Sequence, residues 1–286
     1  MQITDHFQTI AKDFHSFIIE VDGIIQKDQE ISPEALLCLE HLATAGKRVT
    51  LISNRACRTH DFVRQLQRLG VSAGDYQLAI TSGEEAYQHL FRRKDPWHAQ
   101  LGHAVYMVGD TLDRHFIDDL DLRPVHNLEE ADFILTLENI KEGAYSKEWL
   151  YEALHLGLPL VAANPNEVHC EKNRIYPTAG SVAATYTSLG GACFFHGLPY
   201  PRILQSALKF LSPDTPQQVM VVTGSRLETL ETCHALDLRT TLVPTPCLLH
   251  RLDETSDLND VSQHTIIEKI YKSSRIPDAF LSAFRW

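Results

Sequence analysis

The sequence predicts an α/β protein in which helices cover both faces of a parallel sheet. Short apolar runs of strand length alternate along the chain with longer segments of helical periodicity. The first run, Phe17 to Val21, is short and apolar, as expected for a strand that is buried on both faces. The length of 286 residues corresponds to one large domain or two.

The predicted elements follow one another in order. Ser32 is expected to cap a helix that has Pro33 in its first turn, and Gly46 follows the end of this helix. Residues 49–52 form the second strand, and a second amphipathic helix ends before Gly70. The remaining candidate strands are residues 104–108, 133–137, 160–162, 219–222 and 240–243.

The composition excludes several classes of protein. With 44% apolar and 22% charged residues, it is typical of a well-packed globular protein. The net charge of −11 argues against binding to nucleic acid or to anionic lipid, both of which need clustered Lys and Arg. No apolar run reaches transmembrane length and the N-terminus lacks a leader pattern, so we expect neither a membrane span nor a secretory signal.

The six cysteines have no CxxC pair and no regular spacing. Zinc sites and disulfide frameworks need such spacing. We therefore expect six free thiols in a reducing cytoplasm.

Polar residues follow the strands at the positions where ligands bind in a doubly wound sheet. The segment 20–23 (EVDG) offers two carboxylates that could hold a hard cation through oxygen ligands. The segment 53–55 (SNR) offers a hydroxyl, an amide and a guanidinium, which could hold a phosphoryl group. Residues 223–226 follow a third strand. An acidic pair after a strand is also typical of a solvated loop, so the joint placement at two strand ends is the stronger indication.

These motifs resemble the haloacid dehalogenase superfamily of hydrolases, class IIA, which includes nitrophenylphosphatase-like and nucleotide or sugar monophosphatases. The resemblance begins with FIIEVDGII and ISPEALLCLEHLATAGKRVTLISNRA. It continues through ITSGEEAYQHL, ADFILTL, LPLVAANPN, IYPTAGSVAATYTSLGG, HGLPYPRILQSALKF and VMVVTGSRLETLE. The ending RIPDAFLSAFRW is similar to the tail of one bacterial subfamily.

The resemblance implies a Rossmann-like core with an inserted α/β cap. We expect the core to comprise residues 1–80 and 178–286, and the cap residues 81–177. Phosphatases of the family use an aspartate nucleophile, a second aspartate two residues later as acid and base, a phosphate-binding Ser or Thr, a Lys, and Mg²⁺ held with the help of the last motif. Caps of this class often mediate dimerisation, so a homodimer is a further expectation.

Several positions match this pattern. Asp22 fits the acid/base position, and Ser53 fits the phosphate-binding hydroxyl, with Asn54 and Gly23 beside it. The sequence at 164–166 (NPN) matches the family's Asn-Pro-Asp turn except at its last residue, so we expect Asn164 and Asn166 to face the cleft.

The catalytic positions depart from the pattern. The nucleophile position is Glu20, whose extra methylene displaces the attacking oxygen by more than about 1 Å. A misplacement of about 1 Å can lower the rate roughly a hundredfold. Leu198 replaces the lysine and removes a positive charge from the site. Ser225 and Leu230 replace last-motif aspartates, leaving Glu20, Asp22 and Ser225 as a vestigial, doubtful Mg²⁺ site.

Two other acidic features could imitate the missing aspartate. Asp110 follows a glycine, as the aspartate of the family's last motif does, but it precedes a cap strand and is expected to be a cap surface residue. Glu228 and Glu231 are three residues apart on the helix after Gly224. A one-residue shift could bring Glu231 to the site, but a solvated helix face is the simpler interpretation.

The sequence therefore predicts a catalytically impaired or inactive phosphatase homologue that binds a small phosphorylated or acidic ligand. The alternative is a slow Mg²⁺-dependent phosphatase of sugar or nucleotide monophosphates, using Glu20 or Asp22 in altered geometry. The replacements at Leu198 and Ser225 favour the first interpretation, because an active enzyme of this type should not lose both groups. A purely structural role in an oligomer is a third possibility.

Overall fold

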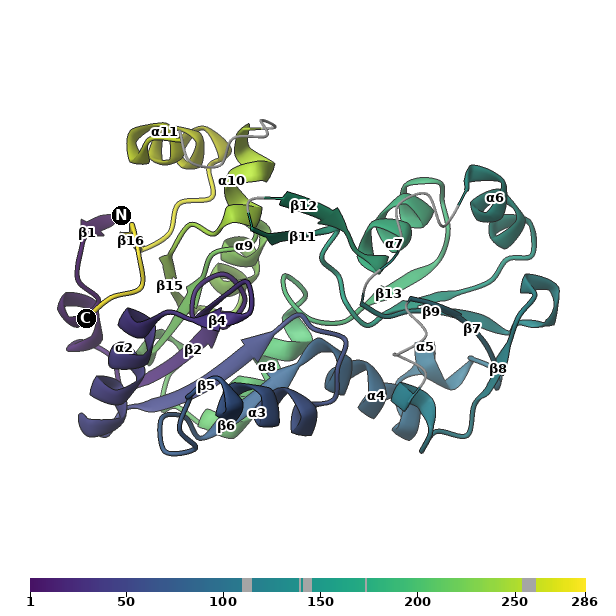
Figure 1. Cartoon of the computed structure of the whole chain (residues 1–286), viewed down its shortest axis with the longest axis horizontal. Coiled ribbons are helices and arrows are strands. Elements are labelled where there is room, and N and C mark those ends of the chain that lie inside the picture. The colour runs from purple at the N-terminus through teal and green to yellow at the C-terminus, as the bar shows by residue number, and fades with distance from the viewer. Residues whose placement is uncertain (110–114, 139, 141–145, 173, 254–260) are drawn as a thin grey trace.

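The computed structural model describes residues 1–109, 115–138, 140, 146–172, 174–253 and 261–286. Within them the chain forms a seven-stranded sheet and a five-stranded sheet, at opposite ends of an elongated molecule (Figure 1). All strand pairs in both sheets are parallel. The predicted α/β class with a parallel sheet is confirmed.

The first predicted strand lies in the interior of the seven-stranded sheet. Its order is β1 (Gln2–Thr4), β16 (Ala279–Leu281), β15 (Arg239–Leu242), β14 (Val219–Thr223), β2 (Ser16–Glu20), β5 (Arg48–Ser53) and β6 (Leu78–Thr81). Every residue of β2 is buried, because β14 and β5 flank it and helices cover both of its faces. This explains why its sequence lacks the polar alternation of a strand with one solvated face.

The helices around this sheet are distributed over its two faces. α2 (Pro33–Thr44) and α3 (Thr59–Arg68) pack against Phe17 and Ile19 on one face. α8 (Pro201–Leu211) packs against Ile18 on the other, together with Cys233 of α9 (Glu228–Ala235). The sheet is therefore doubly wound, as predicted. The remaining helices of this part are α1 (Gln8–Ala11), α10 (Pro246–Asp253) and α11 (Gln263–Ser273), with a 3-10 turn at Pro216–Gln218.

The predicted boundaries of α2 are confirmed in detail. Ser32 accepts a hydrogen bond from the backbone N–H of Ala35 through its side chain. Pro33 is the first helical residue. Gly46 has a φ of +68°, a left-handed conformation that glycine adopts without a Cβ clash, and it follows the end of the helix.

The five-stranded sheet forms the second part of the molecule. Its order is β13 (Cys193–Phe195), β10 (Leu160–Ala162), β9 (Phe133–Thr136), β7 (Ala104–Val108) and β8 (Arg123–Val125). α4 (Ser82–Arg92) packs on one face, with the short α5 (Pro96–Ala99) beside it. α6 (Lys147–His155) and α7 (Ala179–Ser188) pack on the other, and a 3-10 turn lies at Leu128–Glu130.

Sheet membership differs from the expected second boundary of the cap. The sequence suggested that the cap ends at residue 177, but β13 pairs with β10 and α7 packs on the same sheet. The strands of the second sheet therefore extend to Phe195. β13 was not among the predicted strands, and its three residues are only partly buried.

Two antiparallel hairpins are separate from the two sheets, and the second of them lies between the sheets in Figure 1. One is β3 (Gln26–Lys27) with β4 (Glu30–Ile31), and the other is β11 (Val168–Glu171) with β12 (Arg174–Pro177). They touch each other: the Asp28 carboxylate accepts a hydrogen bond of 2.8 Å from the backbone N–H of Lys172. In the part of the chain that the structure describes, none of the helices combines the length and apolar character needed to cross a bilayer.

Candidate functional site

A cavity of about 560 Å³ lies where the carboxyl ends of β2, β5 and β14 face the β11–β12 hairpin. The three strands are parallel neighbours, so the loops that follow them come together at this edge. The volume is within the range of roughly 300–1,000 Å³ that small-molecule sites occupy. Six predicted site residues are among those lining the cavity: Asp22, Gly23, Asn54, Asn164, Asn166 and Ser225.

Glu20, predicted at the nucleophile position, lies beneath the cavity instead of lining it. Its side chain is buried, with only 3% of the residue exposed. The Oε2 atom accepts hydrogen bonds from the Thr223 hydroxyl and the backbone N–H of Gly224, both 2.8 Å, and from the backbone N–H of Ser225 at 3.3 Å. Burial raises the pKa of Glu20. The carboxylate thus ties β2 to the loop after β14.

Asp22 faces the cavity and is already engaged by two neighbours. Its Oδ2 atom accepts a hydrogen bond from the Ser53 hydroxyl at 2.5 Å, and its Oδ1 atom accepts one from Arg55 Nε at 3.0 Å. Ser53 is fully buried and in turn accepts a bond from the backbone N–H of Arg55. Arg55 also donates to the side chain of Gln65. Asp22, Ser53 and Arg55 therefore form one connected polar unit on the cavity wall.

Asn54 connects this wall to two distant segments. Its side-chain amide donates to Asn166 Oδ1 at 2.9 Å and to the Leu198 carbonyl at 2.8 Å, and its Oδ1 accepts from the Leu198 N–H at 2.7 Å. Asn166 is placed by Asn164, whose Oδ1 accepts from the Asn166 backbone N–H at 2.9 Å. The two asparagines predicted to face the cleft do line it.

Leu198, at the predicted lysine position, belongs to the hydrophobic core. It is only 2% exposed and clusters with apolar side chains of β2, β5 and α8, among them Ile18, Ile52 and Ile203. Its backbone, by contrast, holds Asn54. The preceding Gly197 has a φ of +90°, and a Cβ there would lie 2.5 Å from Asn54 Oδ1. The segment thus contributes backbone geometry, and its leucine contributes packing.

Gly23 allows a tight turn at the cavity floor. Its φ is +80°, and a Cβ there would meet the Thr245 side chain at 2.7 Å. Its N–H bonds to the carbonyl of Gln26 at 2.7 Å, which leads the chain into the β3–β4 hairpin. Any larger residue would disturb both the turn and its contact with Thr245.

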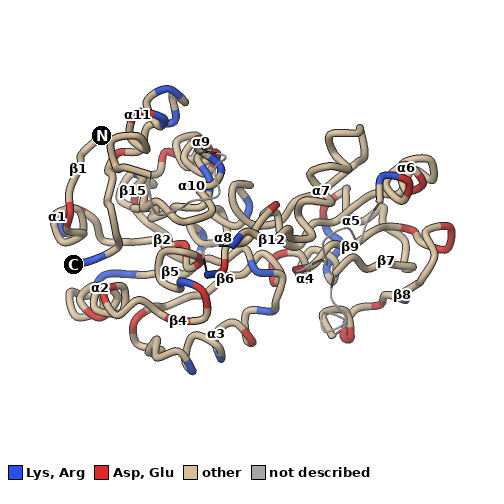
Figure 2. The backbone as a smooth tube through the Cα atoms, turned by 45° about the horizontal axis from the view of Figure 1, so that its top comes forward, with Lys and Arg blue, Asp and Glu red and all other residues tan. Residues whose placement is uncertain are grey.

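The charged residues of the cavity wall are predominantly acidic. Four carboxylates line it, against two cations: Asp22, Asp28, Glu138 and Glu171, with Lys27 and Arg55. Figure 2 shows that basic and acidic residues are distributed along the whole backbone, including the region of β12 and α8 between the two parts. Since Asp22 and Arg55 pair with each other, the remaining charges of the wall sum to a net negative value.

Sequence reasoning missed the residues that reach the cavity from the second sheet and from α10. Glu138, just after β9, accepts a hydrogen bond of 2.6 Å from the backbone N–H of Ala56. Cys170 of β11 and Cys247 of α10 bring their sulfur atoms to 3.2 Å. A carboxylate directly after a predicted strand was a usable signal for Glu138. No local pattern links the two cysteines.

The other acidic candidates lie elsewhere. Glu228 and Glu231 pair with Arg275, at 3.0 and 2.7 Å, on the surface of α9. This agrees with the expected helix face and not with a shift of Glu231 into the site. Asp110 lies outside the described residues.

A partly exposed ionic contact joins the segment after β14 to residues 165–167. Arg226, after β14, donates to the Pro165 carbonyl at 2.9 Å and to Glu167 at 3.1 Å. Arg251 of α10 donates to the same Glu167 oxygen at 2.7 Å. Both arginines thus hold the segment that carries Asn164 and Asn166.

Comparison with known proteins identifies relatives of the chain. Residues 17–123 match the family model described as "Haloacid dehalogenase-like hydrolase". The chain is 25% identical over 225 residues to dihydroxyacetone phosphatase of Corynebacterium glutamicum, covering 75% of this chain and 74% of the relative. It is 24% identical over 223 residues to ribonucleotide monophosphatase NagD of Escherichia coli, covering 74% and 80%. Chronophin of Rattus norvegicus is 26% identical over 265 residues, covering 90% and 84%.

Solved structures share the fold. A haloacid dehalogenase-like hydrolase from Brucella suis superposes with a TM-score of 0.78 at 19% identity, covering 98% of this chain and 99% of that one. A possible sugar phosphatase from Cytophaga hutchinsonii gives a TM-score of 0.78 at 17% identity, covering 100% and 99%. Glycerol phosphate phosphatase of Mycobacterium tuberculosis, solved in complex with magnesium, gives 0.60 at 24% identity, covering 82% and 68%.

Proposed function

Because the chain belongs to the haloacid dehalogenase superfamily of hydrolases, we propose that it is a catalytically impaired phosphatase homologue that binds a small acidic or phosphorylated ligand. The ligand occupies the cavity between the two sheets. The observation that carries this proposal is the position of Glu20: the carboxylate expected to attack phosphorus is buried and held by the loop after β14.

An attacking carboxylate must reach the phosphorus atom at about 3–3.5 Å. Glu20 does not line the cavity, and moving it would leave the donors of Thr223 and Gly224 without their acceptor. A buried donor without a partner costs about 1–3 kcal/mol. Ground-state hydrogen bonding therefore works against nucleophilic attack by Glu20.

Asp22 does not readily take over the attack. It faces the cavity, but each of its oxygens already accepts a hydrogen bond, Oδ2 from Ser53 and Oδ1 from Arg55. Leu198 offers no cation to balance negative charge as it develops on a phosphoryl group. These arguments also weigh against the alternative of a slow phosphatase.

The residues present do not fit a resident Mg²⁺ ion, which prefers near-octahedral oxygen ligands that include carboxylates. Of the three expected donors, Glu20 has its Oε2 atom engaged by three hydrogen bonds from residues 223–225. Ser225 supplies at most a neutral hydroxyl, and Asp22 a backbone carbonyl beside an occupied carboxylate. We therefore assign the ion no part in the function.

The cavity wall suggests what the ligand offers. Arg55 and Lys27 can attract one acidic group, and the amides of Asn164 and Asn166 can hydrogen-bond an uncharged polar part. Since four carboxylates line the same cavity, a ligand with one anionic group suits it better than one with several.

The test combines turnover and binding. We expect a panel of phosphate esters with Mg²⁺ to be hydrolysed no faster by the wild type than by a Ser53→Ala control. A thermal-shift screen of small sugar, polyol and nucleoside monophosphates and carboxylic acids should find ligands whose shift is lost in Arg55→Gln. A Mg²⁺-dependent rate that disappears in Glu20→Gln would overturn the proposal in favour of the slow phosphatase.

A further inference from the structure

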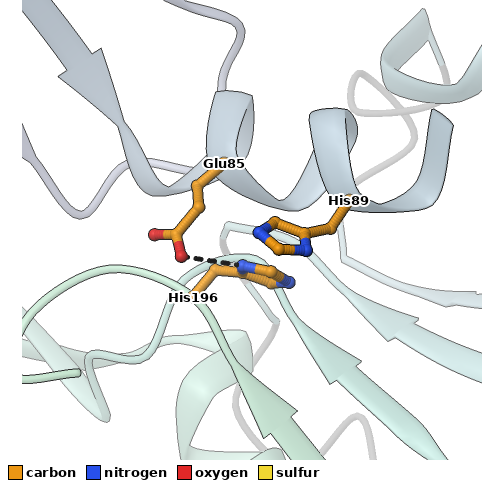
Figure 3. A group of neighbouring side chains, drawn as sticks. All are labelled: Glu85, His89 and His196. Carbon is orange, nitrogen blue, oxygen red and sulfur yellow. Dashed lines mark ion pairs between the residues drawn. The ribbon is translucent and has the colours of Figure 1, made fainter. Parts of the chain in front are cut away.

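A cluster of histidines and carboxylates lies at the connection between the two sheets, away from the cavity (Figure 3). Glu85 and His89 are four residues apart on α4, and so share one face of that helix. His196 follows β13, in the segment that leads into α8. The ligand atoms of these three residues lie within 4.8 Å of one another. The cluster thus joins both segments by which the chain passes between the sheets.

The hydrogen bonds around Asp95 fix the protonation of two of the rings. Its carboxylate lies 2.9 Å from Nδ1 of His89 and 2.9 Å from Nδ1 of His98. A carboxylate only accepts hydrogen bonds, so both Nδ1 atoms carry a proton. In the neutral His98 ring, a proton on Nδ1 leaves the lone pair on Nε2.

The state of His98 in turn determines that of His196. The two Nε2 atoms are 3.2 Å apart, in fully buried rings. Because His98 Nε2 can only accept, His196 Nε2 must carry the proton of this hydrogen bond. In the neutral His196 ring, the proton on Nε2 leaves the lone pair on Nδ1.

That lone pair faces another one. His196 Nδ1 lies 3.3 Å from Glu85 Oε1, and both atoms are buried without a hydrogen-bond partner. Two electron-pair acceptors in contact are unfavourable unless a cation lies between them. Figure 3 shows a ring nitrogen of His89 on the same side, above this pair. Since Nδ1 of His89 is engaged by Asp95, the nitrogen left for a cation is Nε2.

We propose that Glu85 Oε1, His89 Nε2 and His196 Nδ1 bind a divalent transition-metal ion of the zinc type, with water in the fourth position. Two imidazoles and a carboxylate are a common ligand set for zinc, and imidazole does not suit Mg²⁺. With bonds of about 2.1 Å, two ligands of a tetrahedral ion lie about 3.4 Å apart, close to the spacing of the Glu85–His196 pair. A small rotation of the partly exposed His89 ring completes the site.

The remaining polar atoms of the ligands are already oriented. Asp95 receives the proton of His89, His98 receives that of His196, and Glu85 Oε2 accepts from the backbone N–H of Gly197 at 3.0 Å. Such contacts typically affect metal affinity by about 10- to 100-fold.

One positive group also faces the cluster. Arg202 Nη1 lies 3.4 Å from His89 Nδ1, with its guanidinium over the ring of Phe194. Because Nδ1 gives its proton to Asp95, this contact brings positive charge near the ring without a hydrogen bond. The carboxylates of Glu85 and Asp95 outnumber this charge, so the cluster without an ion keeps a net negative charge while its rings are neutral. A bound ion would fasten the two connecting segments together and thereby fix the placement of the second sheet over the cavity.

The test uses the full chain, treated with a chelator and dialysed. Titration with Zn²⁺ against a chromophoric chelator should show one site, unaffected by millimolar Mg²⁺. Co²⁺ in its place should give the visible absorption of a tetrahedral site. We expect His89→Gln and Glu85→Gln to weaken binding at least tenfold, and Asp95→Asn to weaken it by about 10- to 100-fold. His155→Gln, an exposed histidine on α6, is the matched control and should bind as the wild type does.

Three outcomes would overturn the proposal. The first is the absence of stoichiometric binding by the wild type. The second is unchanged affinity in folded His89→Gln, the variant least prone to misfold because His89 is the most exposed of the three ligands. The third is an intense ultraviolet thiolate band with Co²⁺ that disappears in Cys170→Ser, since this would place the ion at the Cys170–Cys247 pair.

Discussion

Asp22 and Arg55 form an ion pair across the cavity wall, with Nε and Oδ1 3.0 Å apart and about a quarter of each side chain exposed. Asp22 follows β2 and Arg55 follows β5 of the seven-stranded sheet, and both would be expected to contact a phosphorylated substrate. Their mutual pairing lets Asp22 orient Arg55 while Ser53 occupies its other oxygen. The ion pair therefore fixes the position of the Arg55 guanidinium on the cavity wall.

The first prediction concerns this pair. A double-mutant cycle of Asp22→Asn and Arg55→Gln should give a coupling of about 1 kcal/mol in the free energy of unfolding, because the pair is partly solvated. Urea denaturation at low and high salt measures it, and salt should reduce the value. A coupling of zero at low salt would mean that the two side chains are oriented independently.

The second prediction concerns the buried carboxylate. Burial raises the pKa of Glu20 above its ordinary value, so the folded state holds this proton more tightly than the unfolded state does. Its contribution to stability is complete below the unfolded pKa and is lost as the pH rises through the folded pKa. The wild type should therefore lose stability relative to Glu20→Gln over that interval. Parallel denaturant titrations from pH 4 upward measure this, and two curves of equal slope would contradict it.

A companion variant separates charge from hydrogen bonding. Glu20→Ala leaves the Thr223 hydroxyl and the Gly224 N–H without their acceptor. It should cost about 2 kcal/mol or more, whereas Glu20→Gln retains an acceptor oxygen and should cost less.

The third prediction concerns Leu198. A lysine introduced there would place its ammonium among the apolar side chains around Ile18 and Ile203. We expect Leu198→Lys to destabilise the protein by about 3 kcal/mol or more, and the volume-conserving Leu198→Met by less than about 1.5 kcal/mol. Restoring the family's lysine alone should therefore not restore hydrolysis. Equal stability of the two variants would indicate that the side chain at 198 can turn toward the cavity.

The fourth prediction concerns the two thiols on the cavity wall. The Cys247 thiol donates to Cys170 across 3.2 Å, which lowers the pKa of Cys170 and raises that of Cys247. Treatment with diamide should convert the two thiols to a disulfide, while the azo reagent is reduced to its hydrazine. Mass spectrometry should show a Cys170–Cys247 cross-link that locks the β11–β12 hairpin to α10.

The matched controls are Cys170→Ser and Cys247→Ser, each of which retains the other five thiols and should form no Cys170–Cys247 cross-link. The ligand-induced shift in melting temperature, measured before and after oxidation, would show whether the β11–β12 hairpin must move for binding. Failure to cross-link the native protein while it remains folded would mean that the thiols are further apart in solution.

The local sequence determined the regular elements and the positions at their ends. Runs such as Phe17 to Val21 are apolar because both faces of this interior strand are covered, and Ser32 with Gly46 marks a helix by local capping chemistry. The same reasoning located Glu20, Asp22 and Ser53, because the ends of parallel strands meet at one edge of a sheet.

Only the tertiary structure decided what these side chains do. Glu20 points into the loop after β14, Leu198 into the core, and Asp22 toward Arg55. Each orientation depends on the polar atoms and apolar surfaces that surround the residue. The meeting of His196 with Glu85 was equally hidden from local periodicity, which reports burial but not partners. Glu20 with Gly224 and His196 with Glu85 are more than a hundred positions apart in the sequence, so these contacts form only when the chain has folded.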